Sequence, residues 1–196
     1  MSVNLGKGQS VSLAKASGGS ELSVVRMGLG WKAAARKGLF GSLRRREIDL
    51  DASAVLYDAE GRLADVVFFQ HLVSNDGSVR HTGDNLVGGA GAGEDDESIL
   101  VDLGQVPQAI RQIVFTVNSY TGQTFQEVEN AHCRLVDERS GQELARYTLS
   151  GGGPHTGQVM AKVFRDGDGG WQMLAIGAPA RGRTFQDMLP AIAPHL

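Results

Sequence analysis

The sequence predicts a mostly β fold, a two-layer antiparallel β-sandwich with one or two short helices, in a single domain over residues 1–196. Three observations predict this fold class. The 27 glycines are spread along the chain, where they separate short runs of β-forming residues. Residues 48–56 alternate between apolar and polar side chains, as a strand with one buried face does. Only two segments carry the start signal of a helix, and both are short.

The expected strands are short apolar or β-branched runs that end at turn residues. In residues 48–56 the even positions are apolar, whereas Asp49, Asp51 and Ser53 project together from the other face. Turns with suitable residues lie at 58–61, 75–77, 138–141 and 166–170. The expected strands are residues 9–13, 22–28, 48–56, 65–69, 98–103, 110–117, 132–136, 144–149, 159–165 and 171–176.

The two expected helical segments begin with capping boxes. Residues 124–127 fit a capping box at the start of a short turn, and residues 184–187 fit one at the start of a C-terminal helix that Pro190 should curtail. A basic stretch over about residues 31–46 has neither pattern. We expect residues 30–46 to form an exposed loop.

The composition excludes several classes of protein. No apolar run approaches the roughly 20 residues of a membrane span, and the N-terminus lacks the apolar core of a secretion signal. The single cysteine, Cys133, cannot form an internal disulfide. We therefore expect a cytoplasmic protein. The formal net charge of -3 gives no general attraction to nucleic acid.

A strongly acidic segment follows a glycine-rich stretch. Residues 81–104 contain six acids and no Lys or Arg, and residues 94–97 are four acids in a row. Each like-charge pair at about 4 Å costs on the order of 1 kcal/mol even in water-like surroundings, so something should offset the repulsion. Solvent and disorder could do so. The sharper alternative is Ca²⁺, which takes about 6 to 8 oxygen ligands in flexible geometry, whereas Mg²⁺ demands a stricter octahedron.

Two other segments could contribute oxygen ligands to the same ion. The turn at residues 75–78 contains Asp76, and Asp49 with Asp51 presents a pair of carboxylates on the strand 48–56. If these segments meet the acidic stretch in space, one or two calcium ions could be enclosed. Zinc is disfavoured because the five histidines are scattered and the single cysteine has no partner at ligand spacing.

At this point the motifs resemble a known family. Ile-Asp-Leu-Asp-Ala-Ser at 48–53, Asn-Asp-Gly-Ser at 75–78, His-Thr-Gly-Asp-Asn at 81–85, Asp-Asp-Glu at 95–97 and Ala-Arg-Tyr-Thr-Leu at 145–149 are similar to those of the TerD family of bacterial tellurite-resistance and stress proteins. The resemblance implies a calcium-binding β-sandwich. The ligands that it implies are Asp49, Asp51, Asp76, Asp84, Asn85, Asp95, Asp96 and Glu97. The stretch 88–93 lacks the acid that family members often carry there, which could lower the affinity for calcium.

The resemblance further implies a non-enzymatic stress-response protein, associated with resistance to tellurite and chemical stress. The ion is expected to stabilise a surface that binds other proteins of a stress-response complex, including membrane-associated ones, and no nucleic acid partner is expected. Direct tellurite chemistry is not expected, because a redox route would need paired thiols and the chain has one cysteine.

Two other functions remain as alternatives. The first is a metal-dependent phosphohydrolase that uses Asp49 or Asp51 as nucleophile, although the basic residues just before 48 argue against the buried parallel strand that such enzymes need. The second is a calcium-dependent binder of carbohydrate or phospholipid. Residues 166–169 resemble the start of an EF-hand, but position 177 is glycine where a bidentate Glu is required, so we interpret them as a hairpin turn.

The one cysteine and two of the histidines are assigned structural roles. Cys133 and His132 are adjacent on an expected strand and should point to opposite faces, so Cys133 is expected to be a buried structural residue. His81 lies close enough to the acids to support a ligand without binding the ion itself.

Overall fold

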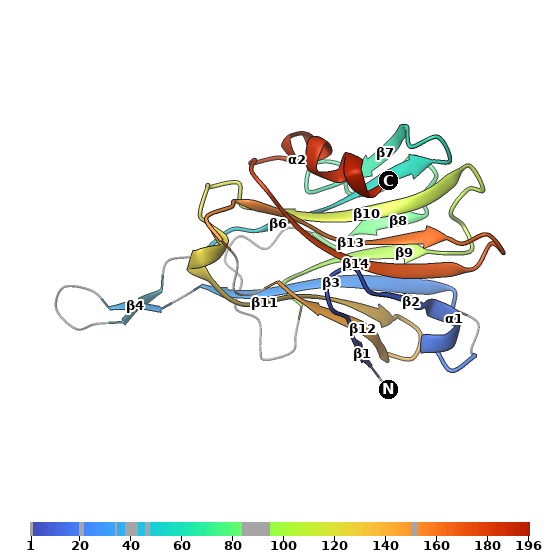
Figure 1. The fold of residues 1–196 in the computed structure, drawn as a ribbon, viewed down its shortest axis with the longest axis horizontal. Coiled ribbons are helices and arrows are strands. Elements are labelled where there is room, and N and C mark those ends of the chain that lie inside the picture. The colour runs from blue at the N-terminus through green and yellow to red at the C-terminus, as the bar shows by residue number, and fades with distance from the viewer. Residues whose placement is uncertain are drawn as a thin grey trace.

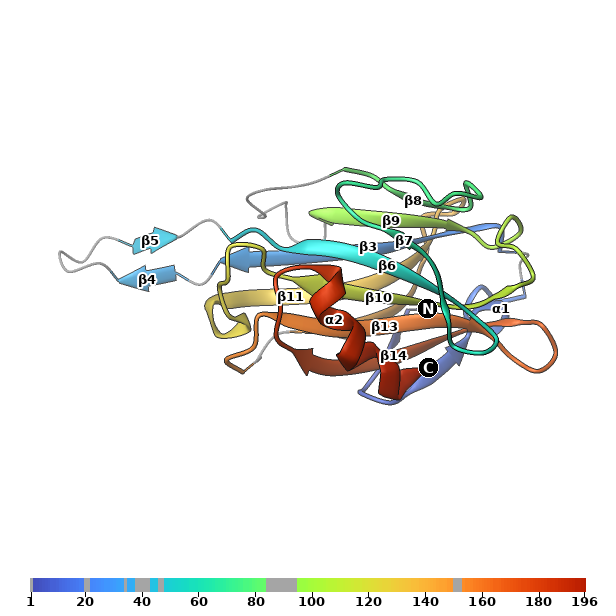
Figure 2. The same cartoon turned by 90° about the horizontal axis from the view of Figure 1, so that it is seen from above.

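Two β-sheets pack face to face to form the body of the molecule (Figures 1 and 2). The structure is a computed structural model of the chain, and it describes residues 2–19, 22–33, 35–37, 43–45, 48–83, 95–149 and 153–196. Within these residues each of the two sheets has six strands, and the pairs are antiparallel except for β1 with β12. The predicted antiparallel β-sandwich is therefore confirmed.

Each sheet is built from strands that are far apart in the sequence. In pairing order, the first sheet consists of β1 (Val3–Asn4), β12 (Glu143–Thr148), β11 (Val128–Asp137), β3 (Val24–Ala33), β9 (Glu97–Asp102) and β8 (Val79–His81). The second sheet consists of β2 (Ser10–Ser12), β14 (Trp171–Ala180), β13 (Gly157–Arg165), β10 (Ile110–Asn118), β6 (Asp51–Asp58) and β7 (Leu63–Val67). A one-turn helix, α1 (Leu13–Ala16), follows β2.

All ten expected strands overlap a strand of the structure, with ends that differ by a few residues. β1 and β8 were not expected, because two or three residues are too few to show an alternating pattern. β6 begins at Asp51 rather than at residue 48.

The expectation of an exposed loop over residues 30–46 is wrong in part. β3 continues to Ala33, and its Trp31 is only 2% exposed. Ala35–Lys37 (β4) then pairs antiparallel with Leu43–Arg45 (β5), which satisfies backbone groups of a segment that was expected to be irregular. Figures 1 and 2 show this hairpin extending away from the two sheets.

The main core lies between the sheets. Alternate residues of β3, such as Met27 and Leu29, face alternate residues of β6, such as Ala54 and Leu56, and all four are at most 2% exposed. Cys133 on β11 is completely buried in this core, as predicted. Burial raises the pKa of its thiol to about 12.

A second, smaller core covers the outer face of the second sheet. The helix α2 (Phe185–Ile192) lies across this face (Figure 2). Its Met188 and Ile192 pack with Val55 and Val114. β6 is therefore buried on both faces. For this reason the polar face predicted for residues 48–56 does not point into solvent.

Both predicted capping boxes are present. The Glu127 carboxylate accepts a hydrogen bond of 3.1 Å from the backbone N–H of Thr124 before η1 (Phe125–Glu127), and Asp187 does the same for Thr184 before α2. The helix continues past Pro190 to Ile192, where the 3₁₀ turn η2 (Ala193–His195) follows. It therefore ends later than expected from the position of Pro190.

Pro190 lies in the last turn of α2, where its ring removes only one of the final helical hydrogen bonds. Among the described residues no helix is both long and apolar enough to cross a membrane.

Candidate functional site

Three consecutive acids at the start of β9 point in three directions. Asp95 lies on the outer face of the first sheet, Asp96 contacts the end of β3, and Glu97 points between the sheets. The repulsion expected within 94–97 is thus reduced for these three residues by their separation in space. The backbone of this segment is fixed as well, because the N–H of Asp96 donates to the Leu29 carbonyl at 2.8 Å.

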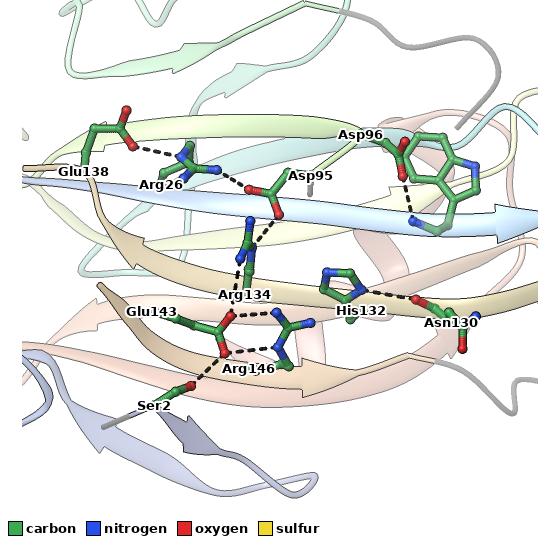
Figure 3. Close-up of polar contacts among 11 residues, drawn as sticks. Ser2, Arg26, Asp95, Asp96, Asn130, His132, Arg134, Glu138, Glu143 and Arg146 are labelled. Carbon is green, nitrogen blue, oxygen red and sulfur yellow. Dashed lines mark hydrogen bonds and ion pairs between the residues drawn. The ribbon is translucent and has the colours of Figure 1, made fainter. Parts of the chain in front are cut away.

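Asp95 is held by two arginines of the first sheet (Figure 3). Its Oδ2 atom pairs with Arg26 on β3, and its Oδ1 atom accepts from Nε of Arg134 on β11 at 2.6 Å. The Asp95 side chain is only 2% exposed, and it lies over Gly28, where a Cβ atom would overlap the carboxylate. The hydrogen bond to Asp95 raises the pKa of Arg134. Since both carboxylate oxygens have arginine partners, the geometry does not support a calcium ligand role for Asp95.

The ion pairs of Asp95 continue in both directions across the first sheet (Figure 3). Arg26 also contacts Glu138 at 2.8 Å, and Arg134 lies 3.5 Å from Glu143. Burial alone would raise the pKa of Glu143, but hydrogen bonds from Arg146 and from Ser2 lower it to about 2. This network supplies the counter-charge that the acidic segment lacks in its own sequence.

Glu97 connects the two sheets at one end of the sandwich. Its Oε2 atom accepts a 2.8 Å hydrogen bond from the backbone N–H of Ala52 on β6, and it lies 3.5 Å from Nε2 of His81 on β8. Nδ1 of His81 accepts from the N–H of Gly83, so in the neutral ring the proton is on Nε2, the atom nearer Glu97. His81 therefore lies beside Glu97, and its support of a calcium ligand stays a prediction.

The start of β6 is tied to the same end of the sandwich. The indole N–H of Trp31 donates to the Ile48 carbonyl at 2.8 Å, and the backbone N–H of Trp31 donates to Asp96 at 2.8 Å. The segment that contains Asp49 and the acids of β9 are therefore held against the same residue of β3. These two acidic segments do meet, as the calcium hypothesis requires.

The carboxylate of Asp51 lies on the opposite face of β6 from the Ala52 position. Asp51 accepts from Nδ2 of Asn118 on β10 at 3.4 Å, and only 5% of its surface is exposed. Strand alternation separates it from Glu97, whose partner Ala52 belongs to the core between the sheets.

Asp76 lies far from Glu97. Ser78, in the same turn, accepts from the N–H of Asp102 at the far end of β9, so about five residues, or roughly 17 Å, separate it from Glu97. The Asp76 carboxylate caps its own turn by accepting from Ser74 and from the Ser78 N–H. Burial would raise the pKa of Asp76, but these hydrogen bonds lower it. Asp76 therefore cannot share an ion with Glu97.

Asp84 and Asn85, with the glycine-rich stretch up to residue 94, lie outside the described residues. Within the described part of the chain, no three His, Cys, Asp or Glu side chains come together in a way that could hold a metal ion. The donor chemistry of Asp49, Asp96 and Glu97 fits a hard cation. These side chains do not complete a coordination sphere by themselves.

The Asp166 segment forms the hairpin turn between β13 and β14, as predicted, with its carboxylate accepting from the N–H groups of Asp168 and Gly170. β6 pairs antiparallel with both β7 and β10, which does not provide the parallel-sheet cleft of the phosphohydrolase alternative. Sequence reasoning missed Arg26 and Arg134, which lie 69 and 39 residues from Asp95.

Comparison with known proteins gives consistent matches along the chain. Residues 1–191 match the family model described as the TerD domain. The tellurium resistance protein TerZ of Serratia marcescens is 48% identical over 188 residues, covering 95% of this chain and 94% of that protein. The stress response protein SCP2 of Bacillus subtilis is 35% identical, covering 96% of this chain and 98% of that protein.

A solved structure gives the same fold. The crystal structure of a homologue of the telluride resistance protein TerD from Streptomyces coelicolor matches with a TM-score of 0.68 at 21% identity, covering 85% of this chain and 95% of that one.

Proposed function

Because the chain belongs to the TerD family of tellurium-resistance and stress proteins, we propose that it is a calcium-binding, non-enzymatic stress-response module whose ion stabilises one end of the sandwich. The names of its relatives support a role in resistance or stress. Calcium binding and protein interaction are our proposals for how that role is carried out.

The observation that carries the proposal is the junction of β6 and β9. Glu97 reaches the backbone of Ala52, and Trp31 links Asp96 to the Ile48 carbonyl, so acids from two distant segments lie at one end of the molecule. Residues 84–94, which include Asp84, Asn85 and Glu94, immediately precede Asp95 in the sequence. Hard oxygen donors of this kind suit Ca²⁺.

The structure also narrows the proposed ligands. Asp96 and Glu97 are retained, together with Asp84 and Asn85. Asp49 is retained as well, because it precedes the first residue of β6 and its neighbour Ile48 is tied to Trp31. Asp95 is left out because arginines occupy both of its carboxylate oxygens. Asp76 is left out because its turn lies at the far end of β9 from Glu97, and Asp51 because its carboxylate lies on the opposite face of β6. When bound, Ca²⁺ would neutralise the remaining carboxylates and join the starts of β6 and β9.

The environment of Cys133 argues against an enzyme that uses a cysteine nucleophile. Cys133, the only cysteine, is completely buried, and burial raises the pKa of its thiol, so it is poorly suited to act as a nucleophile. An ion at the junction would order residues on both sides of it, which can create a surface for partner proteins. We therefore expect calcium to affect the binding of partner proteins to this module.

Isothermal titration of chelator-treated protein with Ca²⁺ tests the proposal. We expect binding at micromolar concentration or tighter, a higher unfolding temperature with calcium, and affinity at least tenfold weaker in Asp96→Asn and Glu97→Gln. Asp168→Asn is the matched control, because Asp168 is exposed in the β13–β14 turn and should leave affinity unchanged. Absence of both heat and a thermal shift in the unaltered protein would refute calcium binding.

A further inference from the structure

A small pocket lies beside α2 on the outer face of the second sheet. It has a volume of about 190 Å³. Its polar floor comes from Asp51 and Ser53 on β6 and from Asn118 at the end of β10, which are 5%, 2% and 2% exposed. The other lining residues include Phe68, Phe69, Tyr120 and Phe185.

The wall of the pocket is a continuous series of four aromatic rings. Phe185 contacts Phe68 with ring centres 4.9 Å apart, Phe68 contacts Phe69 at 5.6 Å, and Phe69 contacts Tyr120 at 6.2 Å. The series runs from the buried Phe185 to Tyr120, which is 52% exposed. A tight turn fixes the two central rings, because Phe68 and His71 exchange two backbone hydrogen bonds.

The floor offers hydrogen-bond acceptors. Nδ2 of Asn118 donates to the Arg183 carbonyl at 2.6 Å and lies 3.4 Å from Asp51, which fixes the orientation of the amide. The Oδ1 atom of Asn118 is consequently an acceptor, and it is buried without a hydrogen-bond partner among the described residues. Such a buried acceptor is costly unless a donor from water or a ligand reaches it.

These features together select the chemistry of a ligand. A carboxylate with an amide and a hydroxyl oxygen favours a cation with several N–H donors, and aromatic faces also attract cations. An anion would be repelled by Asp51. The volume lies below the range of about 300 to 1,000 Å³ that is typical of sites for drug-sized ligands, so a single short chain fits better than a large molecule.

We propose that this pocket binds a primary alkylammonium group. The ammonium lies against Asp51 and the Oδ1 atom of Asn118, and its alkyl chain lies along the rings of Phe68 and Phe185. The group could belong to a free amine or to a lysine side chain of a partner. The proposal does not depend on the calcium site, because the pocket lies on the opposite face of β6 from Glu97.

The test is a titration of the full-length, calcium-saturated protein with n-butylamine hydrochloride, followed by ¹H–¹⁵N NMR. We expect saturable shifts of the Asn118 side-chain amide and of the backbone of residues 68–70 and 118–120. n-Butanol, which has a similar chain but no charge, should bind at least tenfold more weakly. Equal binding of the alcohol would overturn the proposal, as would shifts confined to other residues.

Variants separate the charge from the aromatic wall. Asp51→Asn should weaken amine binding at least tenfold, whereas Asp58→Asn, at the other end of β6, should not. If Asp51→Asn fails to fold, Tyr120→Ala still tests the wall, because Tyr120 is 52% exposed, and it should weaken binding about threefold. Unchanged affinity in a folded Asp51→Asn, or in Tyr120→Ala, contradicts the proposal.

Two further arms identify the occupant. If Nα-acetyl-lysine methylamide binds as tightly as n-butylamine, the occupant is a lysine side chain. If n-butylamine binds and the lysine compound does not, the occupant is a free amine. Both results support an ammonium site. In chelator-treated protein, displacement of bound amine by stoichiometric Ca²⁺ would show that the pocket is a metal site and would overturn the proposal. Failure of calcium binding in the separate titration leaves the amine result intact.

Discussion

The carboxylate of Asp95 accepts a 2.6 Å hydrogen bond from Nε of Arg134, a residue 39 positions further along the chain. Arg26 pairs with the other oxygen of the same carboxylate. Asp95 immediately precedes Asp96 and Glu97, two of the acids that we propose as calcium ligands, so the arginines fix the backbone from which these two side chains project.

Arg134→Gln should reduce the free energy of unfolding by about 1 to 2 kcal/mol, since it leaves a nearly buried carboxylate with one arginine instead of two. Urea unfolding monitored by circular dichroism measures the change. Arg62→Gln is the control, because the Arg62 side chain is 73% exposed and its pair with Asp58 should contribute nothing measurable. Equal stability of Arg134→Gln and the unaltered protein would mean that the pair is not a structural anchor.

Gly28 is expected to be required for the position of Asp95. In Gly28→Ala the new methyl group would overlap the Asp95 carboxylate, so we expect a loss of about 1 to 3 kcal/mol in the free energy of unfolding. Gly167→Ala, at a position where a Cβ atom has no neighbour within 4 Å, should be neutral. A crystal structure of a stable Gly28→Ala variant with Asp95 unmoved would contradict this interpretation.

Glu143 should make stability depend on pH in the acidic range. Its pKa is lowered from the ordinary value of 4.5 to about 2, because hydrogen bonds from Arg146 and Ser2 outweigh the effect of burial. The stabilisation is therefore fully present above pH 4.5 and is lost as the pH falls toward 2.

Glu143→Gln should consequently be less stable than the unaltered protein at pH 6, with a difference that shrinks as the pH approaches 2. Urea titrations at several pH values measure it. A difference that stays constant with pH would show that Glu143 acts by packing alone.

Cys133 should not react with thiol reagents in the folded protein. Burial raises the pKa of its thiol, so very little thiolate is present at pH 8, and the completely buried side chain is inaccessible. Ellman's reagent should detect no thiol in the native protein and one per chain in guanidinium chloride. Rapid reaction of the native protein would place Cys133 at a mobile or open position.

The sequence by itself determined the fold class, the strand positions and the family. These follow from local signals: alternation marks each strand, and the capping boxes at Thr124 and Thr184 mark the helical turns. It also placed Cys133 in the core. The sequence did not predict the exact strand ends, the hairpin β4–β5 or the two-residue strand β1. These features depend on which segments pair with each other.

Only the tertiary structure decided how the acids are used. Asp95, Asp96 and Glu97 look equivalent in sequence, yet their partners are an arginine pair, a backbone N–H of β3 and a backbone N–H of β6. The aromatic pocket is likewise invisible in the sequence, because its rings come from three distant segments. The physical reason is the same in both cases. Local periodicity tells which face a side chain occupies, but its electrostatic partner depends on which strand lies beside it, and that is set by packing across the whole chain.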